Sequence, residues 1–165
     1  MGHHNHDRVE PTVAICTISS SRSHSEDSSG DVIESILCEA DISIGTRELL
    51  DDSVPAIRST VESLANDPDI DGIVTTGGTG VTPDDCTIEA LDQLFEKRLP
   101  GFGELFRQRS IEEIGSRVVA TRATAGIIDA TVVCCLPGSE NAARLGAAEI
   151  IAPELGHLAG LAQRS

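Results

Sequence analysis

The sequence predicts an α/β fold, a three-layer α/β/α sandwich around a largely parallel, mixed sheet. Short apolar runs rich in Val, Ile and Thr alternate along the chain with longer stretches whose apolar positions recur at helical spacing. A chain of 165 residues with 39% apolar content can form one core, and no composition shift marks a second. We therefore expect a single domain over residues 12–165, preceded by a flexible N-terminal segment over residues 1–11.

The first half of the chain predicts two strand–helix units. Residues 12–19, TVAICTIS, form a β-branched apolar run that is typical of a buried strand, and a loop rich in serine and acid follows. From Asp31 the apolar positions recur at helical spacing, which predicts a helix. Residues 42–50 predict a weaker strand. The helix after it carries four apolar residues on one stripe: Val54, Ile57, Val61 and Leu64.

The second half repeats this alternation around one irregular region. Residues 70–76, IDGIVTT, predict a buried strand that a glycine loop connects to a helix. The apolar positions of that helix are Ile88, Leu91, Leu94 and Phe95. Residues 100–126 predict short helices and a strand near Val118. Residues 130–136 predict another buried strand, then a helix through Ala142, Leu145 and Ala148, and a last helix that begins at Pro153.

The charge of the chain excludes two classes of partner. The sequence has 27 acidic residues against 12 basic ones, and its net charge of −15 disfavours electrostatic binding to nucleic acid or to an anionic membrane. Arginine replaces lysine almost throughout, since Lys97 is the only lysine. Such a surface suits a halophilic cytoplasm, such as that of a salt-loving archaeon, because salt screens the self-repulsion.

The sequence also bears on cellular location, on metal binding and on the state of the cysteines. The sequence has no apolar run of about 18 residues and no charged-then-apolar leader, so we expect a cytoplasmic protein. The N-terminal stretch HHNHD could bind a metal weakly, but a disordered terminus is the commoner case, and we assign it no role. The five cysteines form no C-x-x-C pair, and we expect reduced thiols packed as small apolar groups: Cys16, Cys38, Cys86, Cys134 and Cys135.

Three loops leave strand ends with residues suited to ligand binding. They read SSSRSHSEDSSG after the first strand, TTGGTGVTPDD after the third and LPGSE after the last. In open α/β sheets ligands bind at the carboxyl ends of the strands, so we expect these loops to converge on one edge.

The glycine loop has two interpretations from its residues alone. Glycines allow positive φ and let backbone N–H groups approach an anion, but they serve a tight strand-to-helix turn equally well. GGTG is not G-x-G-x-x-G, and no lysine follows it, so a Walker-type phosphate loop is excluded.

Carboxylates flank the glycine loop and the second strand. Asp84 and Asp85 precede a helix, which aspartate often caps, but Thr87 could cap that helix and leave one aspartate free. A carboxylate beside a phosphate loop is an ordinary Mg²⁺ ligand, and Asp52 could supply a second one. The alternative is that Asp52 or Ser53 caps the following helix.

The last loop and three arginines are less specific signals. Pro137 and Gly138 fix a turn, and Ser139 could cap a helix or contact an anion there. Arginine binds phosphate in a bidentate manner, but it more often balances local acid. Both interpretations stay open for Arg107, Arg109 and Arg122.

Four ordered segments resemble the MoaB/Mog family of molybdenum cofactor biosynthesis proteins. They are TTGGTGVTPDDCTIEAL, PGFGELFRQRSIEEIG, TRATAG and LPGSENAARL, and EDSSGD after the first strand fits as well. The resemblance covers roughly residues 12–160. It implies a molybdopterin-binding domain that assembles as a homotrimer or homohexamer and binds molybdopterin. In active members it also implies adenylylation of molybdopterin by Mg-ATP with release of pyrophosphate, before a downstream protein inserts the metal.

The resemblance also implies roles for individual residues. The two essential aspartates of the family match Asp52 and Asp85, as catalytic and Mg²⁺-binding residues. The implied nucleotide contacts are Ser19, Ser29 and Gly30. The implied molybdopterin contacts are Thr76, Gly77, Gly78, Thr79, Gly80, Ser110, Pro137, Gly138 and Ser139.

Two departures from the family pattern favour the MoaB branch. Asp84 stands where the family commonly has arginine, and Cys135 stands where plant and animal adenylyltransferase domains have asparagine. Two functions therefore remain: a molybdopterin adenylyltransferase, or a non-catalytic molybdopterin-binding or scaffold protein of the same fold. Retention of Asp52 and Asp85 favours the enzyme.

Overall fold

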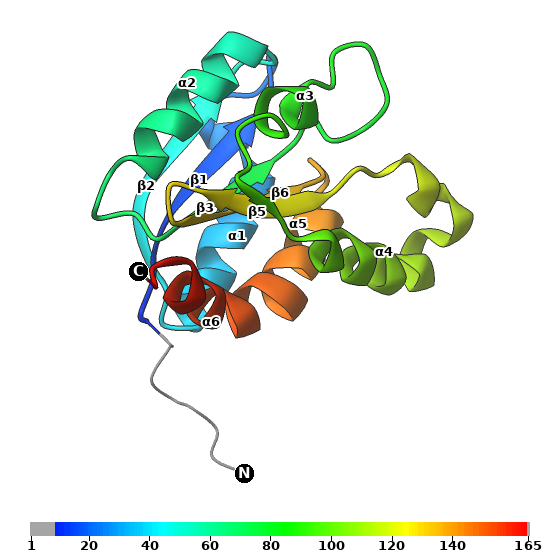
Figure 1. Cartoon of the computed structure of the whole chain (residues 1–165). Helices are drawn as coiled ribbons and strands as arrows, with labels where there is room; N and C mark the ends of the chain where they lie inside the picture. The colour runs from blue at the N-terminus through cyan, green and yellow to red at the C-terminus, as the bar shows by residue number, and fades with distance from the viewer. Residues whose placement is uncertain (1–8, 165) are drawn as a thin grey trace.

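The computed structural model describes residues 9–164, and a six-stranded mixed sheet forms its middle layer (Figure 1). The order across the sheet is β2-β1-β3-β6-β5-β4. The first four strands in this order are parallel, and β5 and β4 are antiparallel to their neighbours. The strands are β1 Thr12–Ile18, β2 Ser43–Leu50, β3 Gly72–Thr76, β4 Lys97–Arg98, β5 Thr124–Ile128 and β6 Thr131–Leu136.

Helices cover both faces of the sheet, as predicted (Figure 1). Helices α2 and α3 pack on one face, and α1, α4, α5 and α6 pack on the other. The α-helices are α1 Ser28–Glu39, α2 Val54–Ala65, α3 Thr87–Leu91, α4 Pro100–Ile114, α5 Glu140–Gly146 and α6 Ala152–Ala162. The short helical segments are the 3₁₀ turns η2 His24–Glu26 and η3 Gly115–Ala120 and the π-helical η4 Ala147–Ile151.

The continuous apolar runs of the central strands follow from burial on both faces. In β1, Val13 and Ile15 join the core under α1, α5 and α6, whereas Ala14 and Cys16 join the core under α2 and α3. Successive side chains of a strand point to opposite faces, so a strand covered on both sides has no polar face. The sequence therefore predicted these strands without showing which face each residue would take.

Several expected elements differ in the structure. The strand expected near Val118 is wrong, because Val118 lies in η3 and the strand is β5, Thr124–Ile128. Helix α3 ends at Leu91, so Leu94 and Phe95 pack from the segment after it. The helix expected from Pro153 begins one residue earlier and continues from α5 through the π-helical η4.

The cysteines and the N-terminus partly follow expectation. All five cysteines are free; Cys16, Cys134 and Cys135 are buried, whereas Cys38 is exposed and the expectation that it packs in the core is wrong. The HHNHD stretch and most of the expected flexible segment fall outside the described residues. Within them, the Val9 N–H donates to the carbonyl of Gly156 (3.2 Å). No helix in residues 9–164 is long and apolar enough to cross a membrane.

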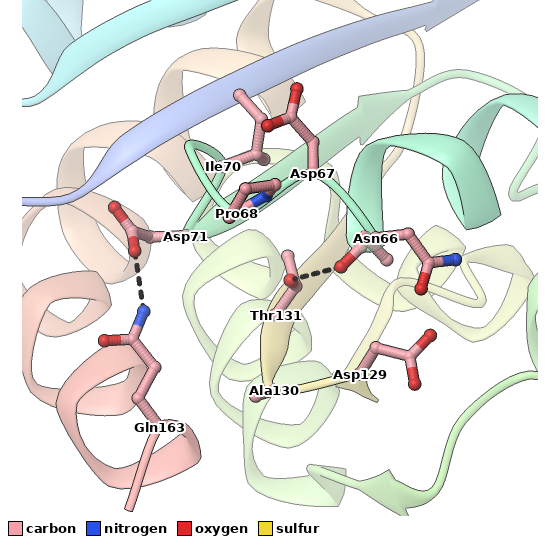
Figure 2. A pocket seen from close by; sticks show the side chains of 10 residues that line it. Asn66, Asp67, Pro68, Ile70, Asp71, Asp129, Ala130, Thr131 and Gln163 are labelled. Atoms are coloured by element: carbon pink, nitrogen blue, oxygen red, sulfur yellow. Dashed lines mark hydrogen bonds between the residues drawn. The ribbon is translucent and has the colours of Figure 1, made fainter.

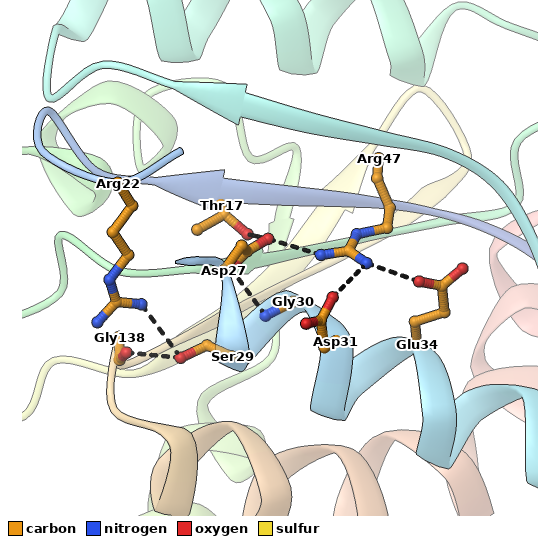
Figure 3. A network of polar contacts seen from close by, with 9 residues as sticks. All are labelled: Thr17, Arg22, Asp27, Ser29, Gly30, Asp31, Glu34, Arg47 and Gly138. Atoms are coloured by element: carbon orange, nitrogen blue, oxygen red, sulfur yellow. Dashed lines mark hydrogen bonds and ion pairs between the residues drawn. The ribbon is translucent and has the colours of Figure 1, made fainter. Parts of the chain in front are cut away.

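A buried carboxylate joins α1 to the sheet (Figure 3). Asp27 caps α1 by accepting from the Gly30 N–H (3.0 Å), and it also accepts from the Thr17 hydroxyl of β1 (2.8 Å). Arg47 of β2 donates to Asp27 (2.8 Å) and pairs with two acidic residues on α1, Asp31 and Glu34. Burial alone would raise the pKa of Asp27, but the Gly30 and Thr17 hydrogen bonds and the Arg47 cation together hold it below its usual value.

The tight turn between β5 and β6 carries backbone strain. Asp129 (φ 46°) and Ala130 (φ 63°) both adopt the left-handed region, which such two-residue turns require. Glycine adopts this region without a steric penalty, whereas the Cβ of alanine clashes with the backbone there. Ala130 therefore destabilises the turn.

We expect Arg47→Met to lower the free energy of unfolding by about 2–3 kcal/mol at neutral pH, because it leaves Asp27 buried with one partner fewer. The depressed pKa of Asp27 contributes stability above the unfolded-state pKa, and this contribution is lost as the pH falls through the folded-state pKa. The stability lost in Arg47→Met should therefore become smaller below about pH 4. Urea titrations of both proteins at several pH values measure this difference. Arg98→Met breaks an exposed pair with Asp92 and should cost under about 1 kcal/mol; an equal cost for both would contradict the role of Asp27.

We expect Ala130→Gly to raise the free energy of unfolding by about 0.5–1 kcal/mol, since it removes the left-handed strain. Ala148→Gly, at an exposed helical position, should lower stability by a similar amount. Denaturant midpoints for the two variants should move in opposite directions, and a loss of stability in both would show that the turn is not strained.

Candidate functional site

Four parallel strands end together at one edge of the sheet. The register pairs Ile18 with Leu50, Thr17 with Thr76, and Thr76 with Leu136, so the last residues of β1, β2, β3 and β6 are neighbours. The connection from β1 runs to β2 on one side, whereas the connection from β3 runs toward β6 on the other. The topological switch point, where successive connections leave in opposite directions along the sheet, therefore lies between β1 and β3. The loops after these two strands form the edge at which such folds bind ligands.

The glycine loop follows β3 and is fixed by its neighbours. Gly77 (φ 102°) and Gly78 (φ 71°) adopt the left-handed region, and a Cβ on Gly77 would lie 2.3 Å from the carbonyl oxygen of Ile18. The Gly77 N–H donates to the carbonyl of Leu136 (2.9 Å), and the buried Thr87 hydroxyl donates to the carbonyl of Gly77 (2.8 Å). Only glycine fits this close approach, so the loop has one defined shape.

Arg122 also fixes the loop. Its N–H donates to the carbonyl of Thr79 (3.1 Å), its Nε donates to the carbonyl of Gly80 (3.0 Å), and its guanidinium pairs with Glu89. Arg109 lies 3.6 Å from Glu149, and Arg107 donates to the carbonyl of Ala123 (3.1 Å). For these three arginines the structure favours local pairing over phosphate binding.

The turn after β6 lies against the glycine loop. The Thr76 hydroxyl donates to the carbonyl of Pro137 (3.0 Å), and a Cβ on Gly138 would lie 3.1 Å from the Cα of Gly77. Ser139 caps α5, since the Ala142 N–H donates to its Oγ (3.2 Å). The loops after β3 and β6 therefore meet, as the sequence predicted.

A small pocket brings Ser110 to the same turn. It has a volume of about 110 Å³ and is lined by Phe106, Ser110, Glu113, Ile114, Thr121, Pro137, Ser139, Asn141, Ala142 and Leu145. The Ser110 hydroxyl donates to the carbonyl of Phe106 (2.8 Å), four residues earlier in α4. The Thr121 hydroxyl oxygen is buried and has no hydrogen-bond partner within residues 9–164. A ligand with a polar group could satisfy it.

The loop after β1 reaches the same turn (Figure 3). The buried Ser29 hydroxyl donates to the carbonyl of Gly138 (2.8 Å), and the guanidinium of Arg22 lies 3.4 Å from Ser29 Oγ. The Gly30 N–H is already bonded to Asp27. Ser19 lies at the start of the loop, where its N–H donates to the carbonyl of Leu50 (2.8 Å). Of the three expected nucleotide-binding residues, Ser19 thus lies on the loop, whereas Ser29 and Gly30 lie in the first turn of α1, and the Gly30 amide is used within the fold.

Neither of the two predicted catalytic aspartates caps a helix. Ser53 caps α2 by accepting from the Ala56 N–H (3.4 Å), and Asp52 instead accepts from Ser20. Asp85 closes a turn with Thr82. Thr87, the expected cap, is the first residue of α3, and its hydroxyl bonds to Gly77; that expectation is wrong. Helix capping, which was the alternative to Mg²⁺ binding, therefore occupies neither carboxylate.

Both aspartates lie near enough to the Cys86 thiol to affect its pKa. Burial raises the pKa of the Cys86 thiol, and the negative charges of Asp52, Glu89, Asp85 and Asp84 raise it further. Burial would also raise the pKa of Asp85, but hydrogen bonds from Thr82 and Gly80 and the charge of Arg122 lower it. Asp85 is therefore ionised at neutral pH. Residues 9–164 contain no group of three or more His, Cys, Asp or Glu side chains suited to hold a metal.

A larger cavity lies at the opposite edge of the sheet (Figure 2). Its volume is about 450 Å³, and it lies where β3 and β6 begin, with Asp67, Asp71 and Asp129 among its lining residues. Asp71 accepts from the Gln163 amide (2.6 Å) and from the Thr12 N–H (2.9 Å). No predicted site residue lines this cavity.

Sequence reasoning missed several residues at the carboxyl edge. Ser20, Arg22, Thr82 and Thr121 all contact the site described above, but each lies in a loop whose path depends on tertiary contacts. A serine, threonine or arginine in a polar loop has no periodic pattern that would have identified it.

Comparison with known proteins agrees with this geometry. Residues 14–157 match the family described as "Probable molybdopterin binding domain". The chain is 40% identical over 157 residues to molybdenum cofactor biosynthesis protein B of Bacillus subtilis, covering 93% of this chain and 92% of that protein. It is 39% identical over 166 residues to the protein of the same name from Staphylococcus epidermidis, covering 96% and 94%.

Solved structures show the same fold. A crystal structure of molybdenum cofactor biosynthesis protein B matches with a TM-score of 0.91 and 39% identity, covering 96% of this chain and 99% of that chain. The tungsten cofactor synthesizing protein MoaB from Pyrococcus furiosus matches with a TM-score of 0.79 and 37% identity, covering 93% and 98%.

We expect Gly77→Ala to lower the free energy of unfolding by about 2 kcal/mol, because its Cβ would collide with the Ile18 carbonyl in a strained backbone region. Gly101→Ala is the matched control, since a Cβ there has no neighbour within 4 Å. It should be neutral or stabilise by about 0.5 kcal/mol. Thermal and urea unfolding compare the two variants, and equal stabilities would contradict a fixed glycine loop.

Proposed function

Because the chain belongs to the MoaB/Mog family of molybdopterin-binding proteins, we propose that it acts in molybdenum cofactor biosynthesis by adenylylating molybdopterin. In this reaction a phosphate oxygen of molybdopterin attacks the α-phosphorus of ATP. The bond from that phosphorus to the bridging oxygen breaks, and pyrophosphate leaves. The product is adenylyl-molybdopterin, an activated pterin ready for metal insertion.

The observation that carries this proposal is that neither Asp52 nor Asp85 caps a helix. Ser53 performs the capping at α2, and Asp85 belongs to a turn beside the glycine loop. Two carboxylates at a phosphate-binding edge fit Mg²⁺, which commonly takes one or two carboxylates together with substrate phosphates. When bound, Mg²⁺ would neutralise charge on the phosphate oxygens.

The other residues of the edge position the two substrates. Transfer of a nucleotidyl group depends on positioning and charge neutralisation more than on a protein nucleophile. The Gly77 amide is bonded to Leu136 and the Gly80 amide to Asp85, so backbone donors for the pterin phosphate would come from Gly78 and Thr79. The pocket at Ser110, Pro137 and Ser139 would hold the pterin, and Thr121 offers it a buried hydroxyl.

The loop after β1 would hold the nucleotide. Ser19 lies on it, and Ser29 and Gly30 follow in the first turn of α1. Arg22 adds a positive charge beside Ser29 in a chain that is otherwise strongly acidic. A guanidinium there can neutralise phosphate oxygens in a bidentate manner.

A non-catalytic molybdopterin-binding or scaffold protein is the second candidate. Asp84 favours it, because its negative charge lies next to Asp85 where the family commonly has arginine. The other departure, Cys135, is completely buried in the core under α2 and α3. It therefore adds no charge to the edge.

We also propose partners and conditions for this function. Exposed apolar side chains on α4 and η3, Ile111 (53% exposed), Ile114 (43%) and Val119 (85%), support self-association into a homotrimer or homohexamer. The product would pass to a metal-insertion protein in the cytoplasm, for molybdenum or tungsten. The acidic surface supports work at high salt, where screening reduces self-repulsion.

Incubation with molybdopterin, ATP and Mg²⁺ in concentrated KCl tests the activity. We expect pyrophosphate and adenylyl-molybdopterin from the unaltered chain. Asp85→Asn and Asp52→Asn should each reduce turnover at least about 100-fold while pterin binding, measured by fluorescence, stays within about twofold. Asp51→Asn removes an exposed carboxylate next to Asp52 and should leave turnover unchanged.

Two results separate the candidates. A folded, pterin-binding chain that releases no pyrophosphate would establish the non-catalytic alternative. Full turnover by Asp85→Asn would limit Asp85 to closing its turn.

A further inference from the structure

The two carboxylates at the edge each accept two hydrogen bonds from one hydroxyl residue, and Asp85 accepts a further one from Gly80. Ser20 donates to Asp52 Oδ2 through its backbone N–H (3.1 Å) and through its hydroxyl (2.9 Å). Thr82 donates to Asp85 Oδ2 through its backbone N–H (2.9 Å) and through its hydroxyl (2.7 Å). Ser20 and Asp52 lie on two different loops, whereas Thr82 and Asp85 lie three residues apart on the loop after β3. In each pair one hydroxyl residue supplies both donors to one carboxylate oxygen.

This arrangement fixes how each carboxylate is presented. Each carboxylate oxygen has about two lone-pair sites, so two donors on Oδ2 use its accepting capacity. Oδ1 is the oxygen of each side chain that these four hydrogen bonds do not use. Two hydrogen bonds to the same oxygen also restrict rotation of the carboxylate.

The Ser20 hydroxyl is itself oriented. The Asp52 N–H donates to Ser20 Oγ (3.1 Å), so that oxygen accepts from the backbone of Asp52 while its hydrogen points to the Asp52 carboxylate. Residues Ser20 and Asp52 are 32 positions apart and join the loop after β1 to the loop after β2. The pairing therefore sets the position of Asp52 relative to the neighbouring loop.

A stability role alone does not account for these pairs. Both lie at exposed positions, where a hydrogen bond contributes only about 0.5–1.5 kcal/mol because water competes for the same groups. Partners that orient a metal ligand, by contrast, change metal affinity even when they contribute little to folding.

We propose that Ser20 and Thr82 are positioning residues, which hold Asp52 and Asp85 so that each presents a single oxygen to a divalent cation arriving with the nucleotide. This inference rests on the proposed adenylyl transfer at the same edge. It assigns to this chain two hydroxyl residues that act on the cation through the carboxylates and touch no substrate.

Binding of Mn²⁺ tests the proposal without turnover. Mn²⁺ replaces Mg²⁺ at oxygen ligands, and its free concentration can be measured by electron paramagnetic resonance. The titration contains α,β-methylene-ATP, which cannot release pyrophosphate. We expect Ser20→Ala and Thr82→Val each to weaken Mn²⁺ binding about tenfold. Ser20→Thr and Thr82→Ser keep the hydroxyl and should restore affinity to within about twofold.

Two matched controls remove the same kind of hydrogen bond elsewhere. Ser35→Ala breaks the bond from Ser35 to Glu39 (3.3 Å) in α1, and Thr46→Val breaks the bond from Thr46 to Glu48 (3.0 Å) in β2. Both should leave Mn²⁺ affinity unchanged. Thermal unfolding of every variant confirms that the chains are folded.

The outcomes distinguish this inference from the function on which it rests. Unchanged Mn²⁺ affinity in folded Ser20→Ala and Thr82→Val, with normal binding by the unaltered chain, overturns the positioning role alone. If the unaltered chain binds molybdopterin but no Mn²⁺ in the presence of the analogue, both the positioning role and the proposed transferase function are wrong.

Discussion

The contact between Gly77 and the last residue of β1 is the constraint on which the edge depends. A Cβ at Gly77 would lie 2.3 Å from the Ile18 carbonyl oxygen, so only glycine lets the chain turn directly over the neighbouring strand. The Gly77 amide is bonded to β6 on the other side. The end of β3 is thus held between β1 and β6, which brings their loops together. Because Arg122 and Thr87 also bond to this loop, hydrogen bonds within the chain fix its shape.

In this acidic chain several of the few positively charged side chains have defined structural contacts. Arg47 is bonded to three carboxylates, and it keeps Asp27 ionised in a site where burial alone would favour the neutral form. Asp27 in turn sets the start of α1 and hence the position of Ser29 beside Gly138 (Figure 3). Arg22, on the loop that precedes Asp27, lies 3.4 Å from Ser29 Oγ, beside the turn after β6.

The sequence predicted most of the fold and the convergence of three loops at one edge of the sheet. It identified β1, β3 and β6 because strands buried on both faces are continuous apolar runs, and it identified the converging loops because parallel strands end together. It missed β5, whose Gly126 lies against Phe95 and whose small residues give weak strand propensity. It also assigned Thr87 to a helix cap, although tertiary packing buries its hydroxyl against the glycine loop.

The sequence by itself determined the α/β class and the family resemblance, and it singled out the glycine loop and the two aspartates as candidates. These depend on local pattern and on ordered motifs. Only the tertiary structure decided which serine or threonine caps a helix and which one holds an aspartate. Ser53 and Ser20 are the same residue type in similar polar loops, yet one bonds to an amide three residues away and the other to a carboxylate 32 positions away. Hydroxyl groups bond to whichever partner the fold brings near, and that partner is not encoded by neighbouring residues.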